Sequence, residues 1–554
     1  MKRIVLFASL LLCLMITPVA PAAEPEPQER KPRLLLFLAI DQARYEYLVR
    51  FRPAFKGGLK YLLDHGVSFT DAHHHHALTA TGPGHAALAT GLHPSRSGIV
   101  GNSWFDRRSG KEMYCVEDSS APILPSREEL QRTGRRSPAA SSAGRSPRNL
   151  LATSLADWMQ TETPESKVFA VSRKDRSAIL LAGQQPDGAF WYEDGRFVTS
   201  TYYEREYPEW VEAFHESDKY PDSFLGKAWE PLPESEAWYD RVGIQDLAEG
   251  LYEEDFPHPI GGLTLAPNPR FYTAFGSTPF MEAYLFRFVK ELIEQEGLGE
   301  DEAVDFLGLS FSVIDSIGHT YGPNSPEIFD GFLRLDQDLG DFMTFLDTQI
   351  GLDNVLISLS ADHGVMPLPE YLKMTEQPGG RLSVADILRF QQMGKQFEAQ
   401  FGEDDWFLSG FYLNYETIGR RNLRRQEVEE ALSRLLEQTD IVDQVWTRTE
   451  LENPPPSPDR FYELYVNSFH PLRSPDLMLQ LQEFYLLSRG YGTSHGSPFE
   501  YDTHVPILLA LPGTAAAEVE QRVYTVDMAP TLARLLGVAA PEKLDGVDLS
   551  GLIQ

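Results

Sequence analysis

PRLLLFLAIDQ, residues 32–42, is a continuous apolar run that ends in an acid, Asp41. This pattern is typical of a buried parallel strand with a polar residue at its carboxyl end, because both faces of such a strand are covered. The pattern recurs in VDFLGLSFSVIDSIGH (304–319) and DNVLISLSADHG (353–364). THVPILLALPG (503–513) predicts another buried strand.

Helical patterns separate these runs. SPEIFDGFLRLDQDLGDFMTFLDTQIG (325–351) begins with a serine that can cap a helix and a proline in the first turn, and TVDMAPTLARLLG (525–537) is a second helix. Strands that alternate with helices predict an α/β fold, an open, mostly parallel sheet with helices on both faces. Ligands bind beyond the carboxyl ends of such strands. Asp41, Asp315 and Asp362 fall there.

The chain has 554 residues, which is more than one compact core normally holds. We therefore expect either two domains or one large catalytic domain over residues 23–554 with insertions at about 105–149, 190–300 and 366–490. The last two are rich in aromatic residues, prolines and acids, and are predicted to form a cap beside the sheet. The Ser- and Arg-rich stretch near 131–148 is assigned no role.

The first 22 residues carry two cations, an apolar run and a small-x-small cleavage site, which predicts a secretory signal peptide. A lipoprotein anchor on Cys13 is the alternative, and Leu12 disfavours it because a small residue is expected there. Only Cys115 survives processing, so no intramolecular disulfide is expected. No later stretch is long and apolar enough to span a membrane. We expect a secreted protein, periplasmic in a Gram-negative cell.

The net charge excludes some partners. Loss of the signal peptide removes Lys2 and Arg3 and no acid, so the formal charge goes from −32 to −34 (−32 − 2). Such a chain repels nucleic acids and anionic membranes. A small anionic substrate must instead meet a local pocket of metal ions or cations.

Acids and histidines follow several predicted strands. Oxygen and nitrogen ligands in this mixture suit zinc, with manganese or iron as alternatives. Singly, such an aspartate is more often a turn residue and such a histidine a hydrogen-bonded surface group, but together they fall where an open sheet places its site. The residues are Asp41, Asp315, His319, Asp362, His363 and His495.

TGPGHAALATG (81–91) combines a sharp Gly-Pro-Gly corner with a helix start. Free amide groups at a helix start bind phosphate, and the Thr81 hydroxyl lies next to them, with Thr79 farther out. On this segment alone, a helix-capping role is the favoured interpretation of Thr81. His73 to His76 resemble a metal site, but consecutive residues alternate faces, so at most two point together. We do not expect them to be ligands, although one could line the site.

Three more residues could contact a phosphate group. Lys174 and Arg176 follow a short predicted strand, and alternate residues of an extended segment point the same way. Asn102 offers an amide donor. A solvated basic turn and an ordinary Asn turn are the alternatives.

These motifs together identify a resemblance. The mature chain resembles the alkaline phosphatase superfamily and, within it, the phosphate-irrepressible, PafA-type alkaline phosphatases. The motifs run in family order from residue 34 to about 550: IDQ, TATGPGHAALATGLHPSRSGIVGNSW, YCVED, SPRNLLATS, VSRKDRSAILLAG, WYEDGRFVTSTYY, DSIGHTYGP, SADHGV and GTSHGS.

The resemblance implies two zinc ions and a phosphothreonine intermediate. It implies that Thr81 is the nucleophile and a ligand of one zinc. It assigns Asp41, Asp362 and His363 to that zinc, and Asp315, His319 and His495 to the other. It implies that Asn102, Lys174, Arg176 and the amide of Gly82 hold the phosphoryl oxygens. The site residues all match the family pattern.

Lys174 and Arg176 favour small phosphate monoesters as substrates, because a monoester dianion gains more from two cations than a diester does. A phosphodiesterase or nucleotide pyrophosphatase with the same metals and threonine is the alternative, and an inactive zinc-binding relative is a second. No Cys-x-Pro-x-Arg or Ser-x-Pro-x-Arg motif indicates a sulfatase. The physiological substrate and the oligomeric state stay open.

Overall fold

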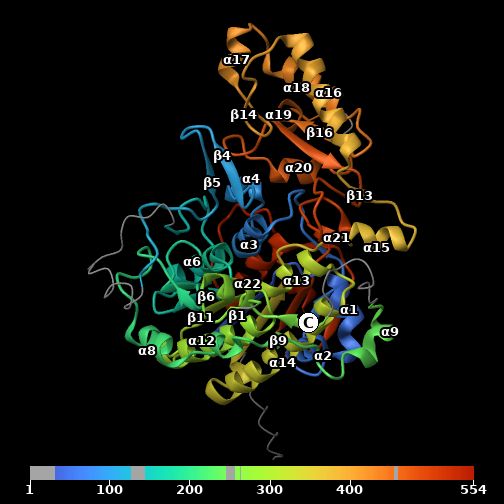
Figure 1. Cartoon of the computed structure of the whole chain (residues 1–554). Coiled ribbons are helices and arrows are strands. Elements are labelled where there is room, and N and C mark those ends of the chain that lie inside the picture. The colour runs from blue at the N-terminus through green and yellow to red at the C-terminus, as the bar shows by residue number, and fades with distance from the viewer. Residues whose placement is uncertain (1–30, 126–143, 245–255, 263, 455–458, 554) are drawn as a thin grey trace, which may run out of the picture.

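The computed structural model describes residues 31–125, 144–244, 256–262, 264–454 and 459–553 (Figure 1). The predicted signal peptide and most of the Ser- and Arg-rich stretch lie outside the described residues. Within them, no helix is long and apolar enough to cross a membrane.

The described residues form a central nine-stranded sheet. Its strands, in spatial order, are β20 (Ala517–Val519), β2 (Val67–Phe69), β19 (Ile507–Ala510), β12 (Val355–Ser360), β1 (Leu34–Ile40), β11 (Asp305–Phe311), β6 (Val168–Ser172), β7 (Gly188–Glu193) and β8 (Arg196–Val198). Strands β12, β1, β11, β6 and β7 are parallel, whereas β19 and β8 run antiparallel to their neighbours. The prediction of a mostly parallel sheet is therefore confirmed.

The register of the three central strands brings their carboxyl ends level. Ile40 pairs with Phe311, and Ala39 pairs with Ser360. The polar residues that follow these strands therefore leave the sheet at one edge.

Helices cover both faces because alternate residues of β1 point to opposite sides. Leu34, Leu36 and Leu38 pack with the first helix group, α1 (Tyr45–Phe51), α2 (Gly58–His65), α12 (Phe280–Glu296) and α14 (Pro326–Gln349). Leu35 and Phe37 pack with the second group, α3 (Thr81–Thr90), α6 (Leu155–Glu162), α7 (Asp175–Ala182) and α22 (Met528–Leu536). Full burial of each such side chain stabilises the fold by about 1.5–3 kcal/mol.

The two predicted helices are confirmed. The side chain of Ser325 accepts a hydrogen bond from the Ile328 amide at the start of α14, and Gly537, in the left-handed conformation, ends α22.

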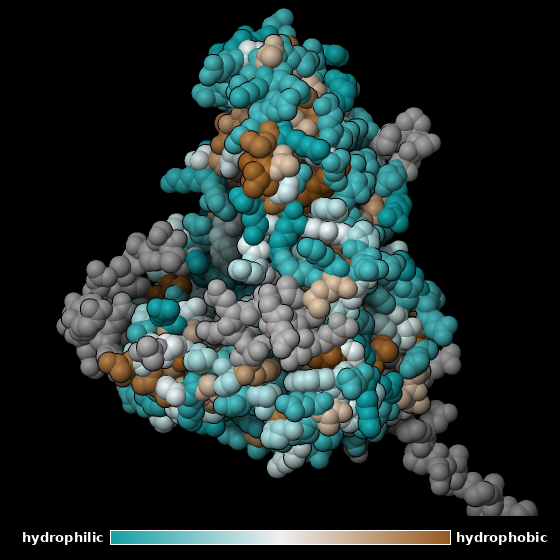
Figure 2. All heavy atoms as spheres, turned by 45° about the vertical axis from the view of Figure 1, so that its right-hand side comes forward, coloured by the Kyte–Doolittle hydropathy of each residue, from teal (hydrophilic) through white to brown (hydrophobic). Residues whose placement is uncertain are grey.

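The third predicted insertion, residues 366–490, stands above the sheet as a cap (Figures 1 and 2). The cap includes α15 (Pro369–Met374), α16 (Val384–Phe401), α17 (Tyr415–Arg420), α18 (Arg425–Leu436), β16 (Val442–Thr447), α19 (Arg448–Glu452), α20 (Tyr462–Ser468) and β17 (Leu477–Leu481). It has a core of its own, in which Phe397, Leu432 and Val445 are buried.

The predicted insertion at 190–300 needs a correction, because part of it belongs to the catalytic body. Strands β7 and β8 form a hairpin that extends the main sheet, and its turn places Asp194 and Gly195 at positive φ. Helix α12 buries Tyr284 and Phe288 in the main core. Aromatic residues with interspersed acids suggested a cap here, but their partners are the sheet and its helices. The first insertion begins within a hairpin of β4 (Ser103–Asp106) and β5 (Lys111–Tyr114).

Candidate active site and metal centre

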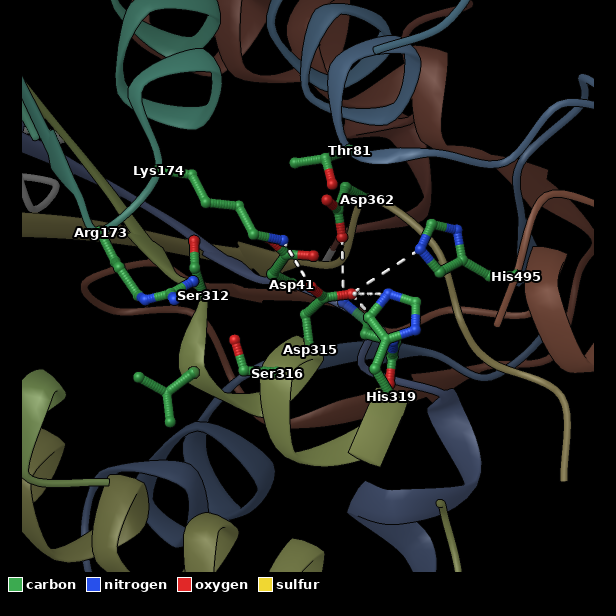
Figure 3. A network of polar contacts seen from close by, with 12 residues as sticks. Asp41, Thr81, Arg173, Lys174, Ser312, Asp315, Ser316, His319, Asp362 and His495 are labelled. Carbon is green, nitrogen blue, oxygen red and sulfur yellow. Dashed lines mark hydrogen bonds and ion pairs between the residues drawn. The ribbon is translucent and has the colours of Figure 1, made fainter. Parts of the chain in front are cut away.

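Thr81 is the first residue of α3, a helix whose ten residues are all buried. Ala80 is the N-cap residue, and it has no side chain that could cap the helix. The capping role considered for Thr81 is therefore not what the structure shows. Its hydroxyl lies 3.3 Å from Nη2 of Arg176, which can donate a hydrogen bond to it. Figure 3 shows Thr81 beside Asp362.

The glycines of the corner allow close packing. A Cβ at Gly84 would lie 2.1 Å from the carbonyl oxygen of Asp362, so no larger residue fits without movement of the backbone. The Gly82 amide donates to Oδ1 of Asn102 at 2.8 Å. This bond occupies the amide expected to contact a phosphoryl oxygen, and it leaves Nδ2 of Asn102 as the donor.

Asp41, Asp362 and His363 meet in one cluster of potential metal ligands. Nε2 of His363 lies 3.5 Å from carboxylate oxygens of both aspartates. Oδ1 of Asp41 and Nε2 of His363 are buried and have no hydrogen-bond partner among the residues that the structure describes. Burial, followed by the Asp362 charge, raises the pKa of Asp41 well above its ordinary value, although Lys174 opposes this shift. Lys174 offsets only part of the negative charge of the two aspartates, and the unpartnered ligand atoms could accept a metal ion.

Asp315, His319 and His495 also converge. Asp315 and His319 lie one turn apart on α13 (Val313–Tyr321), and Nε2 of His319 is 3.2 Å from Oδ1 of Asp315. Nε2 of His495 is 3.7 Å from the same oxygen. The structure brings together all six predicted ligands, but His363 also belongs to a cluster with Asp315 and His495. Its ring stacks on that of His495, with centroids 3.6 Å apart.

Backbone carbonyls orient all three imidazoles. In each ring Nδ1 donates to a carbonyl oxygen, which fixes the tautomer that leaves Nε2 as the ligand atom. The acceptors are Gly364 for His363, Thr493 for His319 and Thr79 for His495. Burial also lowers the pKa of His363 and of His495, so these rings stay neutral, as metal binding requires.

Lys174 connects the two ligand sets. Its ammonium group lies 2.6 Å from Asp41 and 2.6 Å from Asp315 (Figure 3). Burial opposes ionisation of Asp315, but Lys174 and His319 hold its pKa well below the ordinary value. The ligand sets contain three aspartates, and Lys174 contributes one ammonium group. The net charge of these groups is negative, which favours the binding of cations.

Several residues of the site were missed by the sequence analysis. Gln42, next to Asp41, donates from its amide to Asp362 and from its side chain to Asp315. His85, one turn after Thr81, bonds to Ser310 and lies 3.1 Å from Asp362. Their proximity to predicted site residues was the only sequence signal.

Asp502 was also missed, and no sequence signal pointed to it. Its carboxylate accepts hydrogen bonds from the amides of Gly496 and Ser497 and from the Ser497 hydroxyl, at 3.0, 2.8 and 2.6 Å. Its carbonyl accepts from the Gly364 amide at 2.7 Å. Asp502 therefore ties together the loops that carry His495 and His363.

Of the four consecutive histidines, His73, His74 and His76 are buried and His75 is half-buried. His74 bonds to the Ala361 carbonyl and to the Thr525 hydroxyl, so it supports the segment before Asp362. His73 shares a possible metal cluster with Asp71 and His504, but Arg522 already binds both oxygens of Asp71 at 2.8 Å.

Comparison with known proteins agrees with this geometry. The family model described as type I phosphodiesterase / nucleotide pyrophosphatase matches residues 35–504. The chain belongs to this family. It is 32% identical over 547 residues to alkaline phosphatase PafA of Elizabethkingia meningoseptica, covering 94% of this chain and 95% of that one. It is 31% identical over 552 residues to alkaline phosphatase PhoV of Synechococcus elongatus, covering 97% and 95%.

Solved structures give the same result. The crystal structure of wild-type PafA superposes with a TM-score of 0.83 at 29% identity, over 95% of this chain and 99% of that one. A PafA variant with one threonine, one asparagine, one lysine and one arginine replaced has a TM-score of 0.83 at 28% identity, over 95% and 99%. The predicted resemblance, the α/β fold and the phosphatase class are confirmed.

Proposed function

We propose that this chain is an exported, zinc-dependent alkaline phosphatase that hydrolyses phosphate monoesters through a phosphothreonine on Thr81. One observation carries the proposal: the guanidinium of Arg176 reaches the Thr81 hydroxyl, at the edge of the sheet where Lys174 and the ligand clusters lie. Two cations beside a nucleophile suit a substrate that carries two negative charges.

The donor set fits two zinc ions. Asp41, Asp362 and His363, with Thr81, would hold one, and Asp315, His319 and His495 would hold the other. The support is the inward Nε2 atoms and the buried ligand atoms that lack partners. When bound, the ions would supply Lewis-acid stabilisation of charge on the attacking and leaving oxygens.

The residues of the chain account for the rest of the reaction. Oγ1 of Thr81 forms a bond to phosphorus as the bond to the ester oxygen breaks, and the alcohol leaves with the threonine proton. Water then hydrolyses the phosphothreonine, which returns the hydroxyl and releases phosphate. Arg176, Lys174 and Nδ2 of Asn102 would hold the non-bridging oxygens of the phosphoryl group during its transfer.

The PafA variant supports these assignments. Its replaced threonine and asparagine are 21 residues apart and its replaced lysine and arginine are two apart. Thr81 and Asn102 (102 − 81 = 21) and Lys174 and Arg176 have the same spacings.

The description of the family model favours a second function, hydrolysis of phosphodiesters or nucleotide pyrophosphates. The deciding experiment compares p-nitrophenyl phosphate with bis-p-nitrophenyl phosphate, using zinc-loaded wild type and Thr81→Ala. The proposal expects preferential monoester turnover that the variant loses, and about two zinc ions per chain by metal analysis. Preferential diester turnover would refute it, and so would Lys174→Ala and Arg176→Ala proteins with unchanged monoester turnover. Zinc without turnover of either ester would indicate an inactive zinc-binding relative.

Export is the remaining part of the proposal, and it rests on the N-terminal sequence. Expression in a Gram-negative host followed by cell fractionation tests it: the processed chain is expected in the periplasmic fraction, and an unprocessed chain in the cytoplasm would contradict it.

A further inference from the structure

A cavity of about 320 Å³ adjoins the phosphoryl-binding residues on their outer side. It lies between the β7–β8 hairpin, the start of α7 and the end of α11 (Pro269–Phe275). Lys174 and Arg176 line it together with Arg173 and Arg145. Its size is that of a small-ligand site.

Arg173 is the unusual member of this group. Its Nη2 donates a long hydrogen bond of 3.4 Å to the Ser277 hydroxyl. Within the part of the chain that the structure describes, no carboxylate forms an ion pair with it, whereas Lys174 contacts two aspartates and Arg145 contacts Asp175. Figure 3 shows Arg173 next to Lys174, turned toward Ser312.

The acids that line the cavity form no ion pair with Arg173 in the described residues, and the carboxylates whose charge acts on it, Asp315, Glu282 and Asp41, lie outside the lining. Asp175 already accepts hydrogen bonds from Tyr114, from Arg145 and from the Arg176 amide. Glu193 and Asp194 are exposed at the hairpin turn, where water screens them. A guanidinium without a carboxylate partner is stabilised most by a phosphate, which offers several acceptor oxygens.

The cavity adjoins the reaction centre, because Arg176 both lines the cavity and reaches Thr81. One molecule can therefore place its ester phosphate at Thr81 and a second group in the cavity. We propose that Arg173 and the cavity bind a second phosphate group, so that the preferred substrates are monoesters whose alcohol carries a further phosphate a few atoms away. This inference rests on the proposed monoesterase function.

The test compares propane-1,3-diol bisphosphate with propane-1,3-diol monophosphate on the zinc-loaded full chain. Phosphate release gives kcat/KM for the wild type, and calorimetry gives the affinities of the Thr81→Ala protein. We expect the wild type to favour the bisphosphate by about tenfold or more after correction for its two ester groups, since a charge-assisted hydrogen bond is worth at least that factor.

Arg173→Gln should remove this preference while monophosphate turnover changes less than about twofold, and Arg173→Lys should restore part of it. Arg434→Gln, on the exposed side of α18, is the matched control and should leave both substrates unchanged. Thermal unfolding of each variant checks that it is folded. If Arg173→Gln is unfolded, Arg173→Lys decides the matter alone: it should lower kcat/KM for the bisphosphate more than for the monophosphate.

Three results would overturn the inference: equal kcat/KM for the two substrates, equal loss for both in Arg173→Gln, or equal affinities in the Thr81→Ala protein. Failure of the monoesterase proposal gives a different result, because p-nitrophenyl phosphate would then not be turned over. In that event the Thr81→Ala affinities still decide whether the cavity binds a second phosphate.

Discussion

Gly84 is where α3, which carries Thr81, meets the loop that carries the proposed metal ligands Asp362 and His363. A Cβ added there would lie 2.1 Å from the Asp362 carbonyl oxygen and 2.7 Å from its Cα. Ordinary contacts begin at 3.4 Å, so the overlap with the oxygen is 1.3 Å (3.4 − 2.1). Both partners are backbone, so a Gly84→Ala protein must move α3 and the loop apart by roughly 1 Å.

The expected losses of unfolding free energy and of turnover follow from that movement. Overpacking of this kind costs about 1–3 kcal/mol of unfolding free energy. A misplacement of about 1 Å between a nucleophile and its partners costs about 100-fold in turnover. We expect Gly84→Ala to lower kcat for p-nitrophenyl phosphate by about that factor, with urea unfolding and metal content measured on the same protein.

Gly394→Ala is the matched control. Gly394 lies on the exposed face of α16, where an added Cβ would meet nothing within 4 Å. This substitution should leave turnover unchanged and stabilise the protein by about 0.5–1 kcal/mol. If Gly84→Ala kept kcat within twofold of the wild type at an unchanged unfolding free energy, the contact with Asp362 would not set the site geometry.

Three further predictions concern residues around the site. Asp502→Ala should weaken zinc binding by about 10–100-fold in a chelator competition, while Asp502→Asn keeps much of it; equal losses would contradict a role through hydrogen bonding. Tyr114→Phe should raise the monoester KM about tenfold with a smaller change in kcat, because the Tyr114 hydroxyl holds Arg176 at 3.2 Å; steady-state kinetics checks this. Burial lowers the pKa of His73 to about 4, below about 6.5 in the unfolded chain, so the folded state disfavours its protonation. The unfolding free energy should therefore fall by at most about 3 kcal/mol as the pH drops from 6.5 to 4. Urea unfolding should show that the unfolding free energy of His73→Gln depends less steeply on pH than that of the wild type.

Most of the candidate site could be predicted from the motifs, because several of its candidate ligands directly follow strands. Once parallel strands predict a sheet, Asp41 and Asp362 must leave it at the same edge, and the structure places them together. The four-residue spacing of Asp315 and His319 likewise fits one face of a helix. Residues such as Asp502 and Arg173 could not be predicted this way, because each one contacts a residue far along the chain, Gly364 in the case of Asp502 and Ser277 in the case of Arg173.

The predicted insertions show that composition alone also has a limited power to predict structure. Composition predicted a cap at 366–490, and this segment contains a buried cluster of its own. It also marked the β7–β8 hairpin as an insertion, because aromatic and acidic residues look alike in a cap and at the edge of a sheet.

The sequence by itself determined the α/β class, the strand-end acids, the Gly-Pro-Gly corner and the family, since these depend on local patterns read along the chain. Only the tertiary structure decided which atoms meet. It showed that backbone carbonyls orient the three imidazoles and that Lys174 lies between two aspartates. It also showed that the Gly82 amide donates a hydrogen bond to Asn102. These facts depend on distances between segments that lie far apart in the chain, and a local pattern carries no information about such distances.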